Sequence, residues 1–187
     1  LAALAGDAER LAARGEVEIA TDITAVADTM RRHVDRELAR IRVNADPLHR
    51  ARADVAAVAG ALVETLRRTP KGERLAFEVA VPPTVRAPID ADDLTELLGN
   101  LIDNAVRHAR SRVLITWAEG AGGTSLTIAD DGAGIAEADR ASVLERGIRL
   151  DESTQGTGLG LAIAHDIVTA YGHTLELQRA DIGGLAV

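Results

Sequence analysis

Apolar residues recur at three- and four-residue spacing over the first quarter of the chain. In residues 1–14, Leu4, Ala8 and Leu11 share one helical face. Residues 19–43 carry a longer stripe, made up of Ile19, Ile23, Val26, Met30, Val34, Leu38 and Ile41. This spacing predicts two helices. A stripe this long needs a partner helix, so we expect self-association into a helical bundle, with packing onto the rest of the chain as the alternative.

The helix-breaking sequence Asn44-Ala-Asp-Pro47 marks the predicted domain boundary, which divides the chain into residues 1–46 and 47–187. Beyond it, the hydrophobic period predicts helices over 54–68, 90–110, 136–144 and 159–171. Strands are predicted over 73–81, 85–89, 112–119, 125–130, 174–179 and 185–187, the last two joined by a Gly183-Gly184 turn. A helical pair followed by this mixture indicates an α+β protein whose second domain is an α/β sandwich.

Composition narrows the class of protein. The chain has 187 residues, of which 47% are apolar and 27% charged, as in soluble globular proteins. It has no cysteine, which excludes disulfides and thiolate metal sites. The net charge of −8, without a basic cluster, argues against a nucleic acid partner. No apolar run reaches the roughly 20 residues that span a bilayer, so we expect this sequence to be soluble.

Two faces of the predicted helix 90–110 differ in chemistry. One face is apolar and consists of Leu94, Leu97, Leu98, Leu101, Ile102 and Ala105. Another carries polar residues at four-residue intervals, namely Asp92, Glu96, Asn100, Asn104 and His108. Asparagine is a mediocre helix former because its amide competes for backbone hydrogen bonds, so two of them one turn apart suggest oxygens aimed at a ligand. Such oxygens suit Mg²⁺ on substrate phosphates, whereas the alternative is a solvated polar face.

Two further segments combine glycine with polar residues. Asp130-Asp-Gly-Ala-Gly134 follows a predicted strand, where a carboxylate can accept a hydrogen bond from an exocyclic amine and glycines let the backbone approach a ligand. The alternative is an ordinary acidic turn. Residues 155–161 (QGTGLGL) open the predicted helix 159–171, which favours an anion site at a helix N-terminus over the alternative of a flexible hinge. A Walker loop requires a following Lys-Ser/Thr, and a dinucleotide fingerprint requires a strand directly before it. This segment has neither.

In this order and separation, the three segments resemble the N, G1 and G2 boxes of the GHKL superfamily, which includes gyrase, Hsp90, histidine kinases and MutL. Asn100-Leu-Ile-Asp-Asn104-Ala with GTGLGLAI is most similar to sensor histidine kinases, and ERGIR at 145–149 resembles those of the PhoQ type. The resemblance covers nearly the whole chain. It implies a GHKL (Bergerat) α/β sandwich with a mixed sheet, preceded by a truncated antiparallel hairpin like the dimerisation and phosphotransfer domain.

The resemblance also implies roles for residues of the helix 90–110. Asn104, together with Asn100, would hold Mg²⁺ on the ATP phosphates. Glu96 matches the acid that polarises water in the ATPase branch, and it completes the candidate catalytic set. Arg107 stands where kinases often carry a basic residue for phosphate, and His108 stands where many carry tyrosine.

The two glycine-containing segments receive roles from the same resemblance. Asp130 would bind the adenine amine, and its turn would shape the adenine pocket through Gly132, Gly134 and Ile135. The phosphates would be bordered, and the ATP lid hinged, by Gly156, Thr157, Gly158, Leu159 and Gly160. The lid itself is expected over residues 136–155, with Leu144 near the position of its usual phenylalanine and with Arg146 or Arg149 within reach of phosphate.

This likeness implies the ATP-binding catalytic core of a sensor histidine kinase from a two-component system. The expected cofactors are ATP and Mg²⁺. The expected partners are a second copy bound through the N-terminal helices and the receiver domain of a response regulator. We expect a cytoplasmic location and a parent protein anchored in the inner or plasma membrane.

The phosphoacceptor pattern of such kinases, similar to His-Glu-Leu-Arg-Thr-Pro-Leu, does not occur in this sequence. His33 lies in RRHVDREL, without a following Thr-Pro, and LAALAGDAERLA at the start resembles the residues just after that proline. We therefore expect this sequence to bind ATP or ADP with Mg²⁺ without phosphorylating itself. The alternatives are an anti-sigma-type serine kinase, another GHKL ATPase, or a non-catalytic nucleotide-binding dimerisation module.

Overall fold

The computed structural model describes residues 10, 19, 52–120, 123–140, 142–144 and 159–187. The chain divides into two compact units, Leu1–His49 and Arg50–Val187, and nearly every described residue belongs to the second. The predicted dimerisation hairpin therefore lies outside the described residues and stays a prediction. The described part contains no helix that is both long and apolar enough to cross a membrane.

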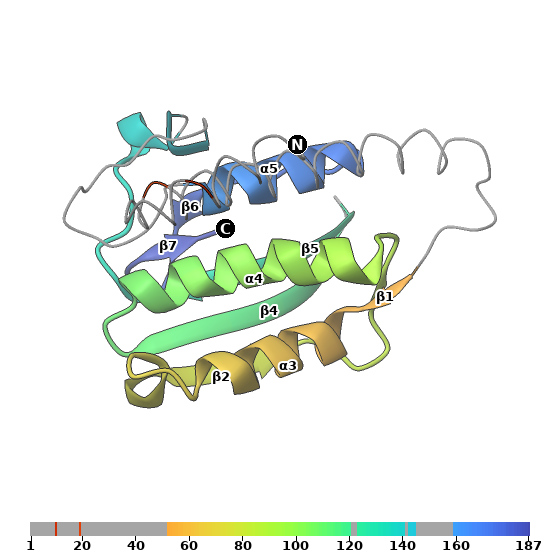
Figure 1. The fold of residues 1–187 in the computed structure, drawn as a ribbon. Helices are drawn as coiled ribbons and strands as arrows, with labels where there is room; N and C mark the ends of the chain where they lie inside the picture. The colour runs from red at the N-terminus through yellow and green to blue at the C-terminus, as the bar shows by residue number, and fades with distance from the viewer. Residues whose placement is uncertain (1–9, 11–18, 20–51, 121–122, 141, 145–158) are drawn as a thin grey trace. The chain divides into compact units, whose positions relative to one another are not determined.

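The second unit contains one mixed sheet covered by helices (Figure 1). Five strands lie in the order β2-β4-β5-β7-β6. The edge strand β2 (Ala76–Ala80) is parallel to β4 (Arg112–Gly120), and every other pairing is antiparallel. The remaining strands of this sheet are β5 (Gly123–Asp130), β7 (Leu185–Ala186) and β6 (Gln178–Arg179). The predicted α/β sandwich with a mixed sheet is confirmed.

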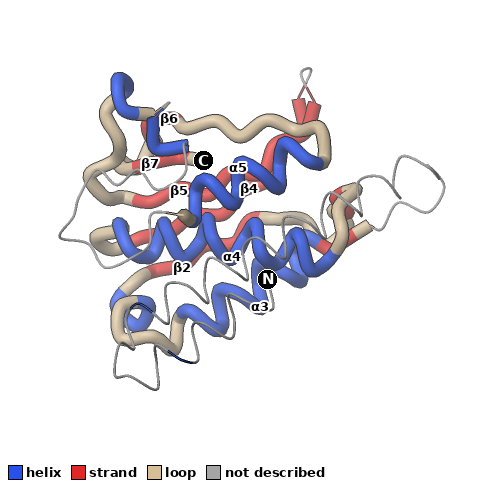
Figure 2. Tube along the Cα trace, turned by 45° about the horizontal axis from the view of Figure 1, so that its top comes forward, coloured by secondary structure: helices blue, strands red, loops and turns tan. Residues whose placement is uncertain are grey.

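Three helices lie side by side over the sheet, with α4 between α3 and α5 (Figure 2). Helix α3 (Val55–Leu66) begins at Asp54, whose carboxylate accepts a 2.9 Å hydrogen bond from Ala57 N. Helix α4 (Ala91–His108) begins in the same way at Asp90, which accepts from Asp92 N at 2.9 Å. Such caps satisfy backbone donors that have no partner inside the helix. Helix α5 spans Gly160–Ala170.

The core forms where α4 meets the sheet. All six residues of the predicted apolar face of α4 are buried. Opposite them, Val113 and Ile115 of β4 are fully buried, and the antiparallel register places Asp130 and Ile128 of β5 beside these two residues. Because side chains alternate along a strand, Asp130 therefore points to the helix-covered face of the sheet.

The predicted strand 73–81 begins too early, because the preceding chain makes a turn. The backbone N–H groups of Gly72 and Glu73 bond back to Thr69, and Gly72–Arg74 forms a 3₁₀ helix, so β2 begins only at Ala76. Val79 is 37% exposed because β2 is an edge strand.

Three other predicted elements differ from those in the structure. Of 85–89, only Arg86–Ala87 (β3) is a strand, and it pairs with Ala53–Asp54 (β1) in a separate two-stranded ribbon. Of 174–179, only β6 is strand. The predicted helix 136–144 is wrong: 3₁₀ turns form at Glu137–Asp139 and Ser142–Leu144, where Asp139 N bonds to Ala136 O three residues back.

Candidate functional site

Asp130 is the only buried polar or charged side chain in the described part of the chain, with 1% of its surface exposed. It ends β5, and its Oδ1 accepts hydrogen bonds from Gly132 N at 2.7 Å and Leu185 N at 3.4 Å. No described residue donates to its Oδ2. Buried polar atoms are nearly always hydrogen-bonded, so this free acceptor fits a ligand that brings an N–H or O–H donor.

Burial raises the pKa of Asp130 above its ordinary value, and the backbone hydrogen bonds and nearby His108 only partly oppose this effect. The charged carboxylate is disfavoured here because it has lost its hydration without gaining a full set of donors. A ligand donor at Oδ2 would supply the missing compensation.

Three glycines bring backbone directly against Asp130. A Cβ atom on Gly132 would overlap the carbonyl oxygen of His108, and one on Gly184 would overlap Oδ1 of Asp130. Gly134 has φ of +73°, a left-handed conformation that favours glycine, and its Cβ position would lie 3.0 Å from Gly184 O. The Gly184 N–H donates to Asp130 O at 3.1 Å. The turn at 130–134 and the start of β7 thus enclose the carboxylate.

Gly184 was not among the residues predicted for the site. The sequence indicates a turn at Gly183-Gly184, and a glycine pair between two predicted strands is the only available signal. Its importance arises because β7 pairs with β5, with Ala129 opposite Ala186, which brings Gly184 beside Asp130.

Asn100 of α4 faces the start of α5. Its Nδ2 donates a 2.8 Å hydrogen bond to Glu96 O, one turn earlier. Its Oδ1 lies 3.3 Å from the position that a Cβ on Gly160 would occupy. Glycine at the first residue of α5 therefore lets the two helices approach closely at this oxygen. Among the predicted site residues, the structure brings Asn100 and Gly160 together.

Asn104 lies one turn after Asn100 and is also half-buried. Its carboxamide has no hydrogen bond to another described residue, so its oxygen is open to a ligand. The side chains of Asn100 and Asn104 together offer neutral oxygen donors, the chemistry that Mg²⁺ accepts when phosphates complete its coordination. Glu96, on the same line, is half-buried.

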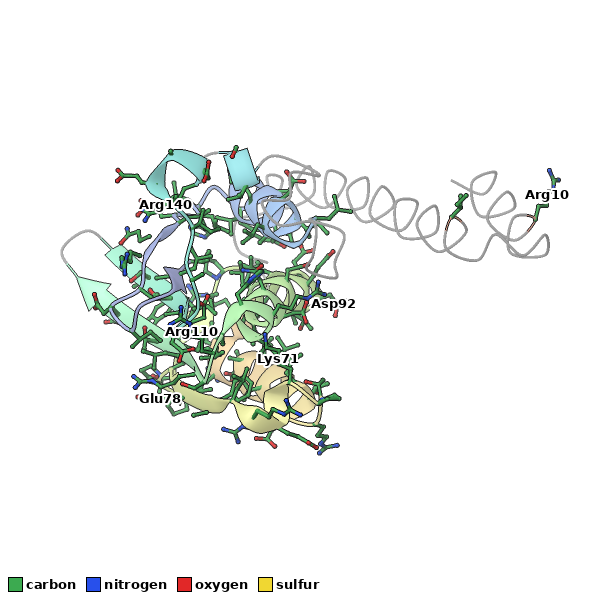
Figure 3. All side chains as sticks on the ribbon, turned by 90° about the vertical axis from the view of Figure 1, so that its left-hand side faces the viewer. Arg10, Lys71, Glu78, Asp92, Arg110 and Arg140 are labelled. Atoms are coloured by element: carbon green, nitrogen blue, oxygen red, sulfur yellow. The ribbon has the colours of Figure 1, made fainter. Side chains whose placement is uncertain are left out.

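The end of α4 is tied to the turn after β5 by Asp131, which sequence reasoning did not select. Its carboxylate accepts from the backbone of Arg110, Ser111 and Arg112 at 2.8, 3.0 and 3.1 Å, and from Ser111 Oγ at 2.6 Å. Burial alone would raise the pKa of Asp131, but these hydrogen bonds hold it well below the ordinary carboxyl range. Figure 3 labels Arg110, the first of the three residues whose backbone donates to Asp131.

The other predicted residues have different positions. Arg107 pairs with Asp103 at 2.8 Å on the surface of α4, and the side chain of His108 is exposed. Ile135 packs against a second apolar cluster that includes Val143 and Leu185. Leu159 is half-buried at the N-cap of α5, whereas Gly156, Thr157, Gly158 and most of the predicted lid lie outside the described residues.

Residues 89–187 match the family described as "Histidine kinase-, DNA gyrase B-, and HSP90-like ATPase". The chain is 41% identical to the sensor protein kinase CarS of Pseudomonas aeruginosa over 187 residues, all of this chain and 42% of that protein. It is 31% identical to the two-component sensor PhoQ of the same organism, over 98% of this chain and 41% of that protein. The chain thus spans about two fifths of these relatives.

A solved structure extends the comparison to three dimensions. The mycobacterial sensor histidine kinase MprB superposes with a TM-score of 0.63 and 31% identity, covering 73% of this chain and 93% of that one. The match to nearly the whole of that structure supports the arrangement of sheet and helices described above.

Proposed function

Since the chain belongs to the family of histidine kinase-, DNA gyrase B- and HSP90-like ATPases, and carries the catalytic region of a sensor kinase, we propose that its second unit binds ATP with Mg²⁺ and presents the γ-phosphate to a histidine. The observation that carries this proposal is Asp130. It is a buried carboxylate with an unused acceptor, enclosed by glycine backbone.

The adenine end of the ligand is assigned to Asp130. Its Oδ2 accepts a hydrogen bond from the exocyclic amine of adenine, which supplies the donor that this oxygen lacks. Guanine carries a carbonyl oxygen at the corresponding ring position, and a carbonyl facing a carboxylate is repulsive. The site should therefore discriminate against guanine nucleotides. The turn formed by Gly132, Gly134 and Ile135 borders the base.

The phosphate end is assigned to α4 and the start of α5. Asn100 and Asn104 would hold Mg²⁺, which neutralises charge on the phosphates when bound. Leu159 caps α5 without a side-chain hydrogen bond, so the first N–H groups of this helix remain available to a phosphate oxygen. Glu96 and Arg107 lie on the same helix and complete the proposed polar lining, with Gly156, Thr157 and Gly158 along the adjoining loop.

The proposed reaction transfers the γ-phosphoryl group to a ring nitrogen of a histidine. The new nitrogen–phosphorus bond forms as the bond from the γ-phosphorus to its bridging oxygen breaks, and ADP leaves with that electron pair. The protein contributes positioning and electrostatic stabilisation.

In the parent protein, an aspartate of a response regulator receives the phosphoryl group, and the N-terminal helices form the homodimer. Use of ATP places this domain in the cytoplasm, and we propose a membrane-anchored parent.

A titration of the chain with fluorescent ADP, with Mg²⁺ and with EDTA, tests the proposal. We expect saturable binding that unlabelled ATP or ADP displaces, that Mg²⁺ strengthens and that GDP displaces poorly. Absence of binding under both conditions would leave only a scaffold function. The two relatives, one named a sensor protein kinase and the other a two-component sensor, weigh against the serine-kinase alternative.

A further inference from the structure

Tyr171 connects the end of α5 to the beginning of α4. Its hydroxyl donates a 2.6 Å hydrogen bond to Asp93 Oδ2 and accepts a 3.3 Å hydrogen bond from the backbone N–H of Asp90. Asp90 is the N-cap of α4, and Tyr171 is the C-cap of α5. The ring is half-buried and packs against the main core. Burial, and then the bond to Asp93, raise the pKa of Tyr171 above its ordinary value.

The other core contacts of α5 are apolar, and apolar contacts have no preferred direction along α4. Its buried side chains are Ala162, Ala164 and Ile167, and three half-buried ones also pack against the main core, namely Leu161, Ile163 and Val168. A hydrogen bond to a charged carboxylate is directional and comparatively strong. The contact between Tyr171 and Asp93 is therefore suited to set the register of the two helices.

That register matters at the opposite end of α5, where Gly160 lies against Oδ1 of Asn100. The helix has 11 residues, so its two ends lie about 16 Å apart at the usual rise per residue. A helix is stiff along its axis, and a slide at Tyr171 therefore moves Gly160 by the same amount relative to Asn100.

We propose that Tyr171 is a positioning residue: its hydrogen bond to Asp93 sets the register of α5 on α4, and thereby the fit between Gly160 and Asn100. This inference rests on the proposed function, because that fit matters for nucleotide binding only if Asn100 and the start of α5 border the phosphates. Tyr171 itself acts only through these helices.

The decisive variant is Tyr171→Phe, which keeps the ring and removes the hydroxyl. We expect the Kd for fluorescent ADP with Mg²⁺ to rise about fivefold, a typical size for coupling between distant sites. Asp93→Ala should weaken binding equally, and the double variant should be no weaker than either single one. Asp93→Asn keeps an acceptor oxygen and should restore most of the affinity. Asp92→Ala is the matched control, since Asp92 is an exposed carboxylate in the same helical turn and should leave the Kd unchanged.

A second readout needs no nucleotide. In ¹H–¹⁵N spectra of the free protein, Tyr171→Phe should shift the resonances of the Gly160 amide and the Asn100 side chain, far from the substitution. If Tyr171→Phe lowers the free energy of unfolding but leaves the Kd and both resonances unchanged, the hydrogen bond is merely structural and the proposal is wrong. If the unsubstituted protein binds no adenine nucleotide, the proposed function fails instead, while the distant resonance shifts still decide whether Tyr171 sets the register.

Discussion

The backbone N–H of Gly132 donates a buried 2.7 Å hydrogen bond to Oδ1 of Asp130. This bond fixes the orientation of the carboxylate, because Oδ1 is held by the protein and Oδ2 has no donor from any described residue. The two oxygens of this carboxylate thus have different roles. One stabilises the turn between β5 and the following loop, and the other is available to a ligand.

Replacing Asp130 with asparagine should separate these two roles. An asparagine oxygen can still accept from Gly132, but the second position becomes an NH₂ donor that faces the donor amine of adenine. We expect the affinity for ATP and ADP to fall about 10- to 100-fold, the range for losing a hydrogen bond to a charged group, while the fold is kept. Isothermal titration calorimetry measures the loss, and circular dichroism checks the fold. Unchanged affinity would remove Asp130 from the adenine site.

Gly184→Ala should disrupt the same site from the other side. The new Cβ would overlap the Asp130 carboxylate, so either the carboxylate or β7 must move. We expect loss of detectable nucleotide binding and a lower free energy of unfolding, by about 1–3 kcal/mol for an overpacked buried position. Urea unfolding followed by the fluorescence of Trp117, the only tryptophan, provides the measurement.

Gly60→Ala is the matched control for that substitution. Gly60 lies in α3, and a Cβ there would meet nothing within 4 Å. Alanine in a helix interior is favoured over glycine by about 0.5–1 kcal/mol, so this variant should be slightly more stable and bind nucleotide normally. Equal effects of the two variants would contradict the specific role of Gly184.

Asn104→Ala tests the proposed Mg²⁺ site. The Asn104 carboxamide has no hydrogen bond to another described residue, and alanine is the better helix former, so the fold should not suffer. The informative quantity is the ratio of the nucleotide affinities with Mg²⁺ and with EDTA. We expect this ratio to fall close to one in the variant, whereas affinity in EDTA changes little. A ratio equal to that of the unsubstituted protein would exclude Asn104 as a metal ligand.

The local elements and the polar line of α4 were predictable because they depend on short-range patterns. Four-residue spacing places Asn100 and Asn104 on one line, and the caps at Asp54 and Asp90 mark their helices. The long-range contacts were not predictable. Gly184 reaches Asp130 only through a two-residue strand, and Tyr171 meets Asp93 across 78 positions of sequence. Neither contact has a periodic signal, since both depend on how elements pack.

The adjacent carboxylates Asp130 and Asp131 predict opposite dependences of stability on pH. The pKa of Asp131 is lowered in the folded protein, so its stabilising effect is present above the unfolded-state pKa of about 4 and is lost as pH falls below it. Asp131→Asn should therefore destabilise the protein at pH 7, and the difference from the unsubstituted protein should shrink in acid. Asp130 has a raised pKa, so stability falls as pH rises above the unfolded-state pKa of about 4, and this loss is complete above the folded-state pKa. The stability of Asp130→Asn, measured relative to that of the unsubstituted protein, should therefore increase as pH rises from 3 to 7. Urea unfolding of both variants between pH 3 and pH 7 measures the slopes, and slopes of the same sign would contradict the assigned hydrogen bonds and burial.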